Sequence, residues 1–516
     1  MRYAFAFLTA IAMACGNGGS SSASSDPGGA STNPDGGSNG ASDGNGGGGG
    51  PASAPAMHHV TVLVTGDGTV RSEPAGIDCP VKCAADFSEG THLIFTATPG
   101  PNSYFSRFTG ACSGAACDLR VTADELIAAR FVPPGVLRVD IAGPGGGHIL
   151  SSPPGIDCRS SCTASFAPGT SVTLNAAPDL VSAAPAWTGA CTGAGCTIAL
   201  TADAHAVANF PYRRYVAHDM GVTTGSSYTR GGAISPNGKY ITGPTYTTTY
   251  APYFGWSAGM LAIGIEDGVS QGINDSGTIV GFVGSHAFVW TFAGGRTDLY
   301  VPDQTMSMAL AVNAQGLVAG TVSYRSTFRG GYWNAGGFVD FGSLDGECSE
   351  ASGINSQGVM VGASCYVPGE PNRWRAVRFR APGVIDDLGI LPGGKQSWAF
   401  AINDSGVIVG ASETADDTHG FYYSDGRMLD IGLPPGMTYA RLAAVNSSGV
   451  AVGMAFNSTT GIPIIYGAGH LIDVNSILVP NGNLPFEVHG IDDRAGIIAT
   501  GFVPSGETHA LLLIPQ

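Results

Sequence analysis

Histidine and aspartate recur at fixed places in residues 212–516, and these residue types build metal sites and acid–base pairs. Paired carboxylates could also cleave a glycosidic bond. Because each residue occupies the same place in a repeat, we expect structural roles instead: each His bonds to neighbouring backbone and each Asp caps a turn. We predict no catalytic residue, no metal and no cofactor. The residues are His286, His419, His509, Asp340, Asp387, Asp430 and Asp473.

Other reactive motifs are weaker. The Asn-Asp-Ser sequences at Asn274 and Asn403 match a glycosylation sequon and faintly resemble a calcium loop, but a hairpin turn explains them better. The chain has no Walker loop and no His-Glu-x-x-His. The sequence therefore offers no catalytic constellation.

Aromatic and arginine residues gather in the segments between the second and third predicted strands of several repeats. Such side chains on one rim suit stacking against sugars or anchoring a protein. Ordinary loop variation is the alternative. The candidate ligand-binding rim is Tyr246, Tyr250, Tyr253, Tyr324, Arg325, Tyr366, Arg373 and Trp374.

A repeat must position that rim. Its core, Ala/Gly-Ile/Val-Asn-x-x-Gly-x-x-x-Gly, occurs around Asn274, Asn313, Asn355, Asn403 and Asn446, with degenerate copies at 234–238 and 491–496. A spacing near 40 residues with four short strands per unit is typical of a β-propeller. We predict seven blades over 212–516, with each Asn-x-x-Gly forming a hairpin turn in which Gly has positive φ.

The ends of this region predict ring closure. Residues 215–221 form a fourth-strand element without a preceding core, and 509–514 a third-strand element without a following one. We expect the first to complete the last blade, which removes exposed sheet edges. His286-Ala287-Phe288 together with the Ile-Asn-x-x-Gly core resembles the HAF-repeat family of bacterial extracellular proteins. That resemblance implies no catalytic residues.

Cysteines mark a tandem duplication upstream. Cys79, Cys83, Cys112 and Cys117 recur 79 residues later as Cys158, Cys162, Cys191 and Cys196. Alternating apolar residues predict small all-β modules over 58–133 and 134–211. The Gly-x-Gly-x-Val start at 66–70 and the Pro-x-Gly-Ile-x-Cys segment at 74–79 resemble the divergent internalin B-type repeat of bacterial surface proteins. The resemblance implies a spacer or adhesion role.

The cysteines favour disulfides over zinc, because the chain is predicted to be exported to an oxidising compartment. Four cysteines in each module allow three pairings. We expect the nearest-neighbour pairing, 79–83 and 112–117, with its counterpart in the second module. Cys348 and Cys365 are expected to form a further disulfide across the fourth repeat.

The N-terminus predicts export and anchoring. Met1-Arg2, the apolar residues 3–14 and Cys15 form a lipoprotein-type signal peptide over 1–15, with Cys15 as the lipidated residue. Simple secretion is the alternative. Residues 16–57 are rich in Gly and Ser and predict a disordered tether. We expect attachment to the outer membrane or cell surface, with no other membrane contact.

Composition narrows the function class. The net charge of −16 and only three lysines argue against nucleic-acid binding, and 79 glycines without a Gly-X-Y period exclude collagen. We therefore predict a monomeric all-β protein in which two disulfide-stapled modules present a propeller. Its function would be non-catalytic binding or adhesion to an extracellular protein or polysaccharide. The alternative is an extracellular propeller enzyme, either a polysaccharide lyase or a glycosidase.

Overall fold

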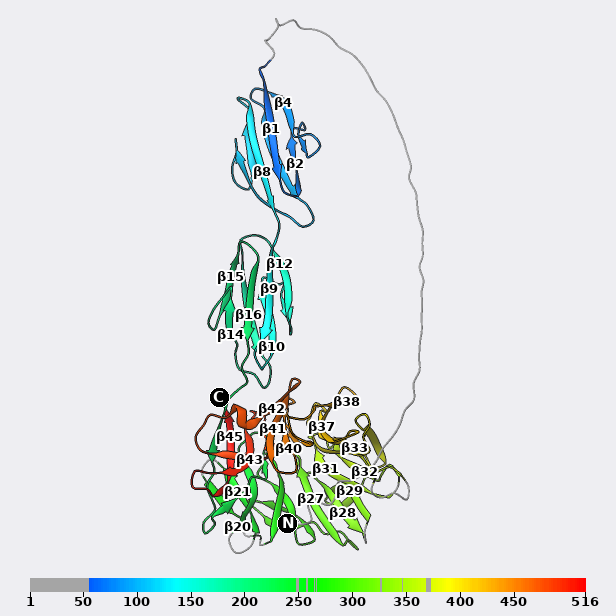
Figure 1. Cartoon of the computed structure of the whole chain (residues 1–516). Helices are drawn as coiled ribbons and strands as arrows, with labels where there is room; N and C mark the ends of the chain where they lie inside the picture. Colours follow the sequence, from blue (N-terminus) through cyan, green and yellow to red (C-terminus); the bar gives the residue numbers. More distant parts are fainter. Residues whose placement is uncertain are drawn as a thin grey trace, which may run out of the picture.

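Strands dominate the chain. The computed structural model describes residues 55–246, 250–256, 259–263, 265, 267–324, 327–345, 347–367 and 373–516. Two small β modules follow one another and lead to a larger ring of sheets (Figure 1). The predicted signal peptide, Cys15 and most of the tether lie outside the described residues. Within those residues, no helix is long and apolar enough to cross a membrane.

The first module is a sandwich of two four-stranded sheets with orders β4-β1-β8-β6 and β3-β2-β5-β7. Alternate residues of each strand face the core: Val60 and Val62 are buried, and Leu63 is exposed. The strands are β1 (Met57–Thr65), β2 (Gly68–Glu73), β3 (Asp78–Cys79), β4 (Ala84–Ser88), β5 (His92–Pro99), β6 (Tyr104–Gly110), β7 (Cys117–Arg120) and β8 (Glu125–Val132).

The second module repeats this topology strand for strand, with orders β12-β9-β16-β14 and β11-β10-β13-β15. The sequence duplication is therefore a duplication of fold. The strands are β9 (Gly135–Ala142), β10 (Gly147–Ser152), β11 (Asp157–Cys158), β12 (Cys162–Phe166), β13 (Thr170–Pro178), β14 (Ala186–Gly189), β15 (Cys196–Leu200) and β16 (Ala204–Asn209).

Disulfides staple both modules with the nearest-neighbour pairing. The bonds are Cys79–Cys83 and Cys112–Cys117 in the first module, and Cys158–Cys162 and Cys191–Cys196 in the second. A further bond joins Cys348 to Cys365. The predicted disulfides are thus confirmed among the described residues.

The remaining strands form a β-propeller, here divided into four-stranded blades. The strands of a blade follow chain order from the axis outward, except in the last blade, whose outermost strand comes from the start of the propeller region. The first strands of neighbouring blades contact one another. The all-β fold with a propeller is confirmed. The blades are β18 (Tyr228–Thr229) and β19 (Ala233–Ile234) with β20 (Ile241–Tyr246), β21 (Tyr250–Trp256) and β22 (Gly259–Ala262); β23 (Gly268–Ile273), β24 (Ile279–Val283), β25 (His286–Thr291) and β26 (Gly295–Asp298); β27 (Met306–Val312), β28 (Val318–Tyr324), β29 (Thr327–Asn334) and β30 (Gly337–Asp340); β31 (Ser349–Ile354), β32 (Met360–Cys365), β33 (Trp374–Ala381) and β34 (Val384–Gly389); β35 (Ser397–Ile402), β36 (Ile408–Glu413), β37 (Thr418–Ser424) and β38 (Arg427–Asp430); β39 (Tyr439–Val445), β40 (Ala451–Phe456), β41 (Gly461–Gly467) and β42 (His470–Asp473), followed by the 3-10 helix η1 (Val474–Ile477); and β43 (Leu484–Ile491), β44 (Ile497–Phe502) and β45 (Thr508–Pro515) with β17 (Tyr215–Asp219).

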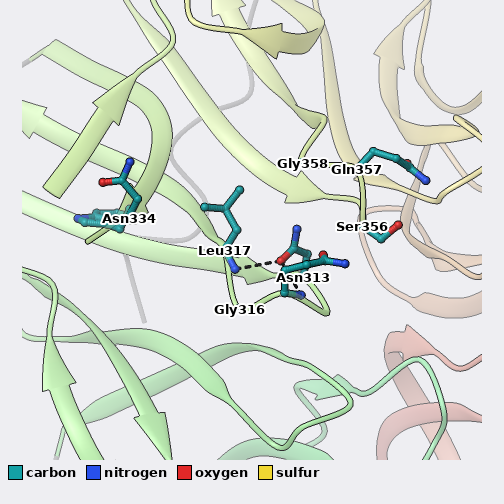
Figure 2. Close-up of a pocket in the computed structure, with 9 residues that line it drawn as sticks. Asn313, Gly316, Leu317, Asn334, Ser356, Gln357 and Gly358 are labelled. Carbon is teal, nitrogen blue, oxygen red and sulfur yellow. Dashed lines mark hydrogen bonds between the residues drawn. The ribbon is translucent and has the colours of Figure 1, made fainter. Parts of the chain in front are cut away.

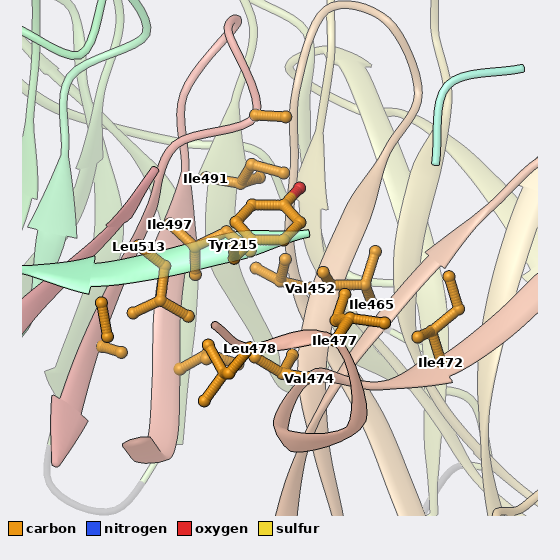
Figure 3. Packing of buried hydrophobic residues seen from close by; sticks show 14 of the residues in the cluster. Tyr215, Val452, Ile465, Ile472, Val474, Ile477, Leu478, Ile491, Ile497 and Leu513 are labelled. Carbon is orange, nitrogen blue, oxygen red and sulfur yellow. The ribbon is translucent and has the colours of Figure 1, made fainter. Parts of the chain in front are cut away.

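The ring closes as predicted. β17 pairs antiparallel with β45, so the strand that enters the propeller completes the blade that ends it. Tyr215 of β17 packs beside Leu513 and Ile497 of that blade, in a core that also takes in Val452 and Ile465 of the preceding blade (Figure 3). Closure removes two free sheet edges and buries apolar surface at the seam.

Antiparallel strands give the propeller two distinct faces. The Asn-x-x-Gly turns between first and second strands lie on one face, which we call the turn face; they include 274–277, 313–316, 403–406 and 446–449. The connections between second and third strands lie on the opposite face, which we call the loop face; they include 284–285, 414–417, 457–460 and 503–507.

The second module docks on the turn face. Val181 belongs to a buried cluster with Val450, which follows an Asn-x-x-Gly turn, and it lies against Gly467 at the β41–β42 hairpin. Asp179 Oδ2 lies 3.5 Å from His470 Nε2. The loop face therefore points away from the stalk formed by the two modules (Figure 1).

Candidate functional site

The predicted rim residues of the first blade lie at the end of β20 and along β21. Tyr246 ends β20 with 43% of its surface exposed, and it pairs in register with Tyr250 at the start of β21. Both positions are on the loop face. The side chain of Tyr250 and the whole of Arg325 lie outside what the structure describes.

Two predicted rim residues are core residues. Tyr253 is fully buried and its hydroxyl donates to the carbonyl of Arg230 at 2.8 Å. Trp374 is buried against the Cys348–Cys365 disulfide and Trp398. The prediction was wrong for both because strand pairing, which the loop spacing does not reveal, turns these side chains inward.

Three other rim residues keep partial exposure at the loop face: Tyr324, Tyr366 and Arg373. The guanidinium of Arg375 lies over the Tyr366 ring, with its Cζ 4.3 Å from the ring centre. The Tyr366 hydroxyl donates to the Lys395 carbonyl at 3.4 Å. Burial raises the pKa of Tyr324, and the nearby Asp340 and Asp303 add to that shift. The described rim is therefore Tyr246, Tyr324, Tyr366 and Arg373.

The repeated Asp residues cap turns as expected. An Oδ1 atom accepts from the backbone N–H two residues later at Asp340, Asp387, Asp430 and Asp473. Two of the three repeated His residues, His419 and His509, contact a carboxylate and not the backbone that we predicted, and His286 Nδ1 lies 3.3 Å from Ser285 Oγ. His419 Nδ1 lies 2.8 Å from Asp430 Oδ1, and His509 Nδ1 lies 2.8 Å from Asp219 Oδ1.

The two His–Asp contacts form because each His lies at the start of the third strand and its partner Asp ends the fourth strand beside it. Arg329 and Arg375 occupy the same position in two other blades, and they lie 3.8 Å from Asp340 and 2.9 Å from Asp387. In these four blades the position therefore carries a basic side chain, His or Arg, beside the turn-capping Asp. In the described residues, no group of three or more His, Cys, Asp or Glu side chains could hold a metal.

A constellation of charged residues that we did not predict lies near the propeller axis. The residue five positions before each repeat Asn, or its counterpart, lies on the first strand of its blade, except that Arg230 lies between the short strands β18 and β19. Three of these seven residues are apolar and four are charged, and three of the charged ones fall on consecutive blades around the closing seam. In blade order the residues are Arg230, Val269, Met308, Glu350, Trp398, Arg441 and Glu487.

Contacts join the charged residues at the seam. Arg230 forms an ion pair with Glu487, and Glu487 lies 3.8 Å from His489. His489 Nε2 lies 2.7 Å from Thr500 Oγ1 on the next strand of the same blade. The side chains of Arg230, Glu487 and His489 keep 34%, 26% and 17% exposure, so solvent reaches them. We call Arg230, Arg441, Glu487 and His489 the axial cluster.

Electrostatics make this cluster locally positive. Burial lowers the pKa of His489 to about 4, the two arginines lower it further and Glu487 opposes them, so the imidazole is neutral at pH 7. Arg441 Nε is enclosed and has no hydrogen-bond partner among the described atoms. Two guanidinium groups and one carboxylate thus lie near His489, in a chain of net charge −16. Aligning the repeats and inspecting the position five before Asn would have found three of these residues.

A shallow cavity of about 380 Å³ lies on the turn face between two neighbouring blades (Figure 2). Asn313, Leu317, Asn334 and Ser356 are among its lining residues. Asn313 Oδ1 accepts from the backbone N–H of Leu317 at 2.9 Å, so its amide oxygen already serves the turn. This cavity is a groove between structural turns and carries none of the predicted rim residues.

Comparisons with known proteins cover parts of this architecture. Residues 58–133 match the divergent InlB B-repeat domain. A comparison with curated proteins finds no match. Similar solved structures include a putative TolB from Agrobacterium tumefaciens, which is 10% identical. The match covers 59% of this chain and 99% of that chain, with a TM-score of 0.32. The Dos1 propeller is 11% identical, and the match covers 54% of this chain and 76% of that chain, with a TM-score of 0.33.

Uncomplexed Pyrococcus horikoshii acylaminoacyl peptidase has 12% identity and a TM-score of 0.39, over 56% of this chain and 52% of the peptidase. This chain therefore spans about half of that enzyme's length. The family match covers the first module alone. Assignment of residues 215–515 as a propeller rests on the strand topology described above.

Proposed function

We propose that this chain is an exported, lipid-anchored surface protein whose propeller binds an extracellular polysaccharide or protein on its loop face. The InlB-type repeat and the disulfides support export. The proposal includes lipidation at Cys15. It also includes a second InlB-type repeat over 134–211 and a seven-bladed HAF-repeat propeller over 212–516.

One observation about the loop face supports this proposal most directly. The stalk docks on the turn face, so the loop face, with the partly exposed Tyr246, Tyr324, Tyr366 and Arg373, points away from the anchored end. Aromatic and Arg side chains on a face directed outward suit recognition of large extracellular ligands.

A glycan and matrix-protein panel probed with the full chain tests binding. We expect saturable retention that falls about tenfold or more in a Tyr324→Ala, Tyr366→Ala, Arg373→Ala triple variant, because hot-spot aromatics and Arg each contribute more than ~1 kcal/mol. The matched control is Phe292→Ala, an exposed aromatic in a turn-face hairpin. Equal retention by triple variant and control would remove the loop face from the proposal. Release of oligosaccharides would favour the enzyme alternative.

Fractionation tests the anchor. In cells that process bacterial lipoproteins, the full chain should partition into the detergent phase, and Cys15→Ser should move it to the aqueous phase. A lipid chain binds membranes by burying its methylenes, which the serine variant lacks. Cys348→Ser serves as the control for loss of a cysteine. A detergent-phase Cys15→Ser protein would contradict lipidation at this residue.

A further inference from the structure

We propose that the axial cluster binds the carboxylate of an acidic saccharide that enters from the loop face. The proposal deepens the binding function above and rests on it. It starts from Arg441, whose guanidinium has no ion-pair partner among the described residues and whose Nε lacks an acceptor. Guanidinium groups bind carboxylates through two parallel hydrogen bonds, so an unpaired one beside the axis is suited to that group.

Arg441 lies close to the loop-face end of its strand. β39 begins at the loop face with Tyr439, and Arg441 is two residues further along the same strand. Alternate residues of this strand, Ala440 and Leu442, are buried between blades, whereas Tyr439 and Arg441 keep partial exposure. A ligand that reaches the axis from the loop face would therefore meet Tyr439 and then Arg441.

The fixed ion pair limits the charge that the cluster accepts. Arg230 and Glu487 hold each other, and Glu487 adds a negative charge beside the site. With neutral His489, the cluster has one net positive charge, which suits a singly charged carboxylate better than a dianionic phosphate. Glu487 and His489 also offer acceptors for hydroxyl groups, and sugars carry several hydroxyls next to an acidic group.

An aromatic side chain beside Arg441 favours a sugar over an acidic peptide. Tyr439 lies two residues before Arg441 on β39, on the same side of the strand, and keeps partial exposure. An Arg together with an aromatic ring matches an acidic sugar, because the sugar presents an apolar face and a charged edge. An acidic peptide shares only the carboxylate.

Calorimetric titration of the full chain tests the site. The probes are trigalacturonic acid, its methyl ester and triglutamate. We expect trigalacturonic acid to bind, the ester to bind at least tenfold more weakly, and affinity to fall as salt rises. Arg441→Gln should lose about tenfold or more in affinity, and Arg441→Lys should recover part of it. The matched control, Arg427→Gln, removes an exposed Arg at a turn-face hairpin.

Thermal unfolding of each variant shows whether the substitution has disturbed the blade, so that binding is compared only between folded chains. Equal binding of trigalacturonic acid by the parent chain and a folded Arg441→Gln variant would overturn the proposal. Failure of the parent chain to bind it at millimolar concentration would also overturn it. Preferential binding of triglutamate would replace the saccharide with an acidic peptide.

Results on the panel separate this inference from the proposed function. If the loop-face triple variant loses panel retention and Arg441→Gln keeps it, the proposed function is supported and the axial site is contradicted. Arg441-dependent binding of trigalacturonic acid without any panel retention would leave the axial site alone.

Discussion

At the scale of single residues, the repeat asparagine uses both ends of its side-chain amide. Its Oδ1 accepts from its own turn, as in Asn403, where Val407 N–H donates at 2.9 Å. Its Nδ2 donates to the carbonyl of the corresponding residue in the next blade, as from Asn403 to Asn446 at 2.9 Å. The same bond links Asn274 to Asn313, Asn313 to Asn355, Asn355 to Asn403, and Asn446 to Asp492.

Replacing one such residue should therefore weaken a turn and a blade junction together. Asn403→Ala leaves the N–H of Val407 and the carbonyl of Asn446 without their bonds at a buried position. We expect a loss of about 2–3 kcal/mol in unfolding free energy, measured by urea denaturation. Asn334→Ala, at an exposed turn, is the control. A loss below ~0.5 kcal/mol for Asn403→Ala would contradict the inter-blade role.

Glu350, the isolated acidic residue of the axial positions, makes stability depend on pH. Burial raises its pKa from 4.5 to about 7, so the folded state favours the neutral carboxyl. The favourable contribution is present below pH 4.5 and is lost as pH rises towards 7 and above. Glu350→Gln should thus match the parent chain at pH 4.5 and exceed its unfolding free energy by up to about 3 kcal/mol at pH 8.

Urea unfolding at pH 4.5, 6 and 8 measures this difference. Glu73→Gln, at an exposed position on β2, controls for the loss of one negative charge. If the Glu350→Gln and parent curves stay parallel across the three pH values, the buried carboxyl is not the cause.

At the scale of elements, the Cys348–Cys365 disulfide joins β31 and β32. Cys348 directly precedes β31, and Cys365 is the last residue of β32. Trp374, which pairs in register with Cys365, packs against this disulfide together with Trp398 of the next blade. The covalent bond and the two indole rings hold the loop-face ends of neighbouring blades together.

A Cys348→Ser, Cys365→Ser double variant should lose about 3 kcal/mol, because the closed loop no longer restricts the unfolded chain. The tryptophan emission of the blade should also shift to longer wavelength as water reaches the two rings. Replacing Cys112 and Cys117 by Ser, in the first module, provides the control. Unchanged propeller unfolding in the first variant would remove the disulfide from the stability of this blade.

Sequence periodicity predicted these elements well and their side-chain directions poorly. The Asn-x-x-Gly spacing located the hairpins, where Gly277 and Gly406 have φ of 76° and 84°. Tyr246 and Tyr253 are close in the chain, yet one is exposed and the other buried, because strand register decides which face each residue takes. The axial cluster depends on ring closure, which brings Arg230 against Glu487 across 257 residues.

At the scale of the whole molecule, the second module and the propeller are joined by a packed interface. Val181 is buried in a cluster that includes residues of the last two blades, and its carbonyl accepts from Arg213 N–H at 2.9 Å. The Tyr212 ring meets His470 edge-on at 5.8 Å. These contacts fix the linker at 211–214 against both units.

Val181→Asp should open this joint, because it places an unpaired charge among apolar side chains. Limited trypsin digestion should then cut after Arg213 and Arg214 about tenfold faster than in the parent chain, since cleavage follows the open population. The matched control is Leu180→Asp, at a neighbouring residue that is 41% exposed. Equal cleavage of both variants and the parent would show that the joint does not protect the linker.

The closing strand gives this architecture a mechanical property. β17 follows directly from the linker that leaves the stalk and runs from the turn face towards the loop face beside β45. When a ligand on the loop face is pulled against the stalk, tension therefore acts along β17. Its hydrogen bonds to β45 then carry the load together in shear, and they do not open one after another like a zipper. The strand that seals the ring is also the strand through which the propeller withstands force.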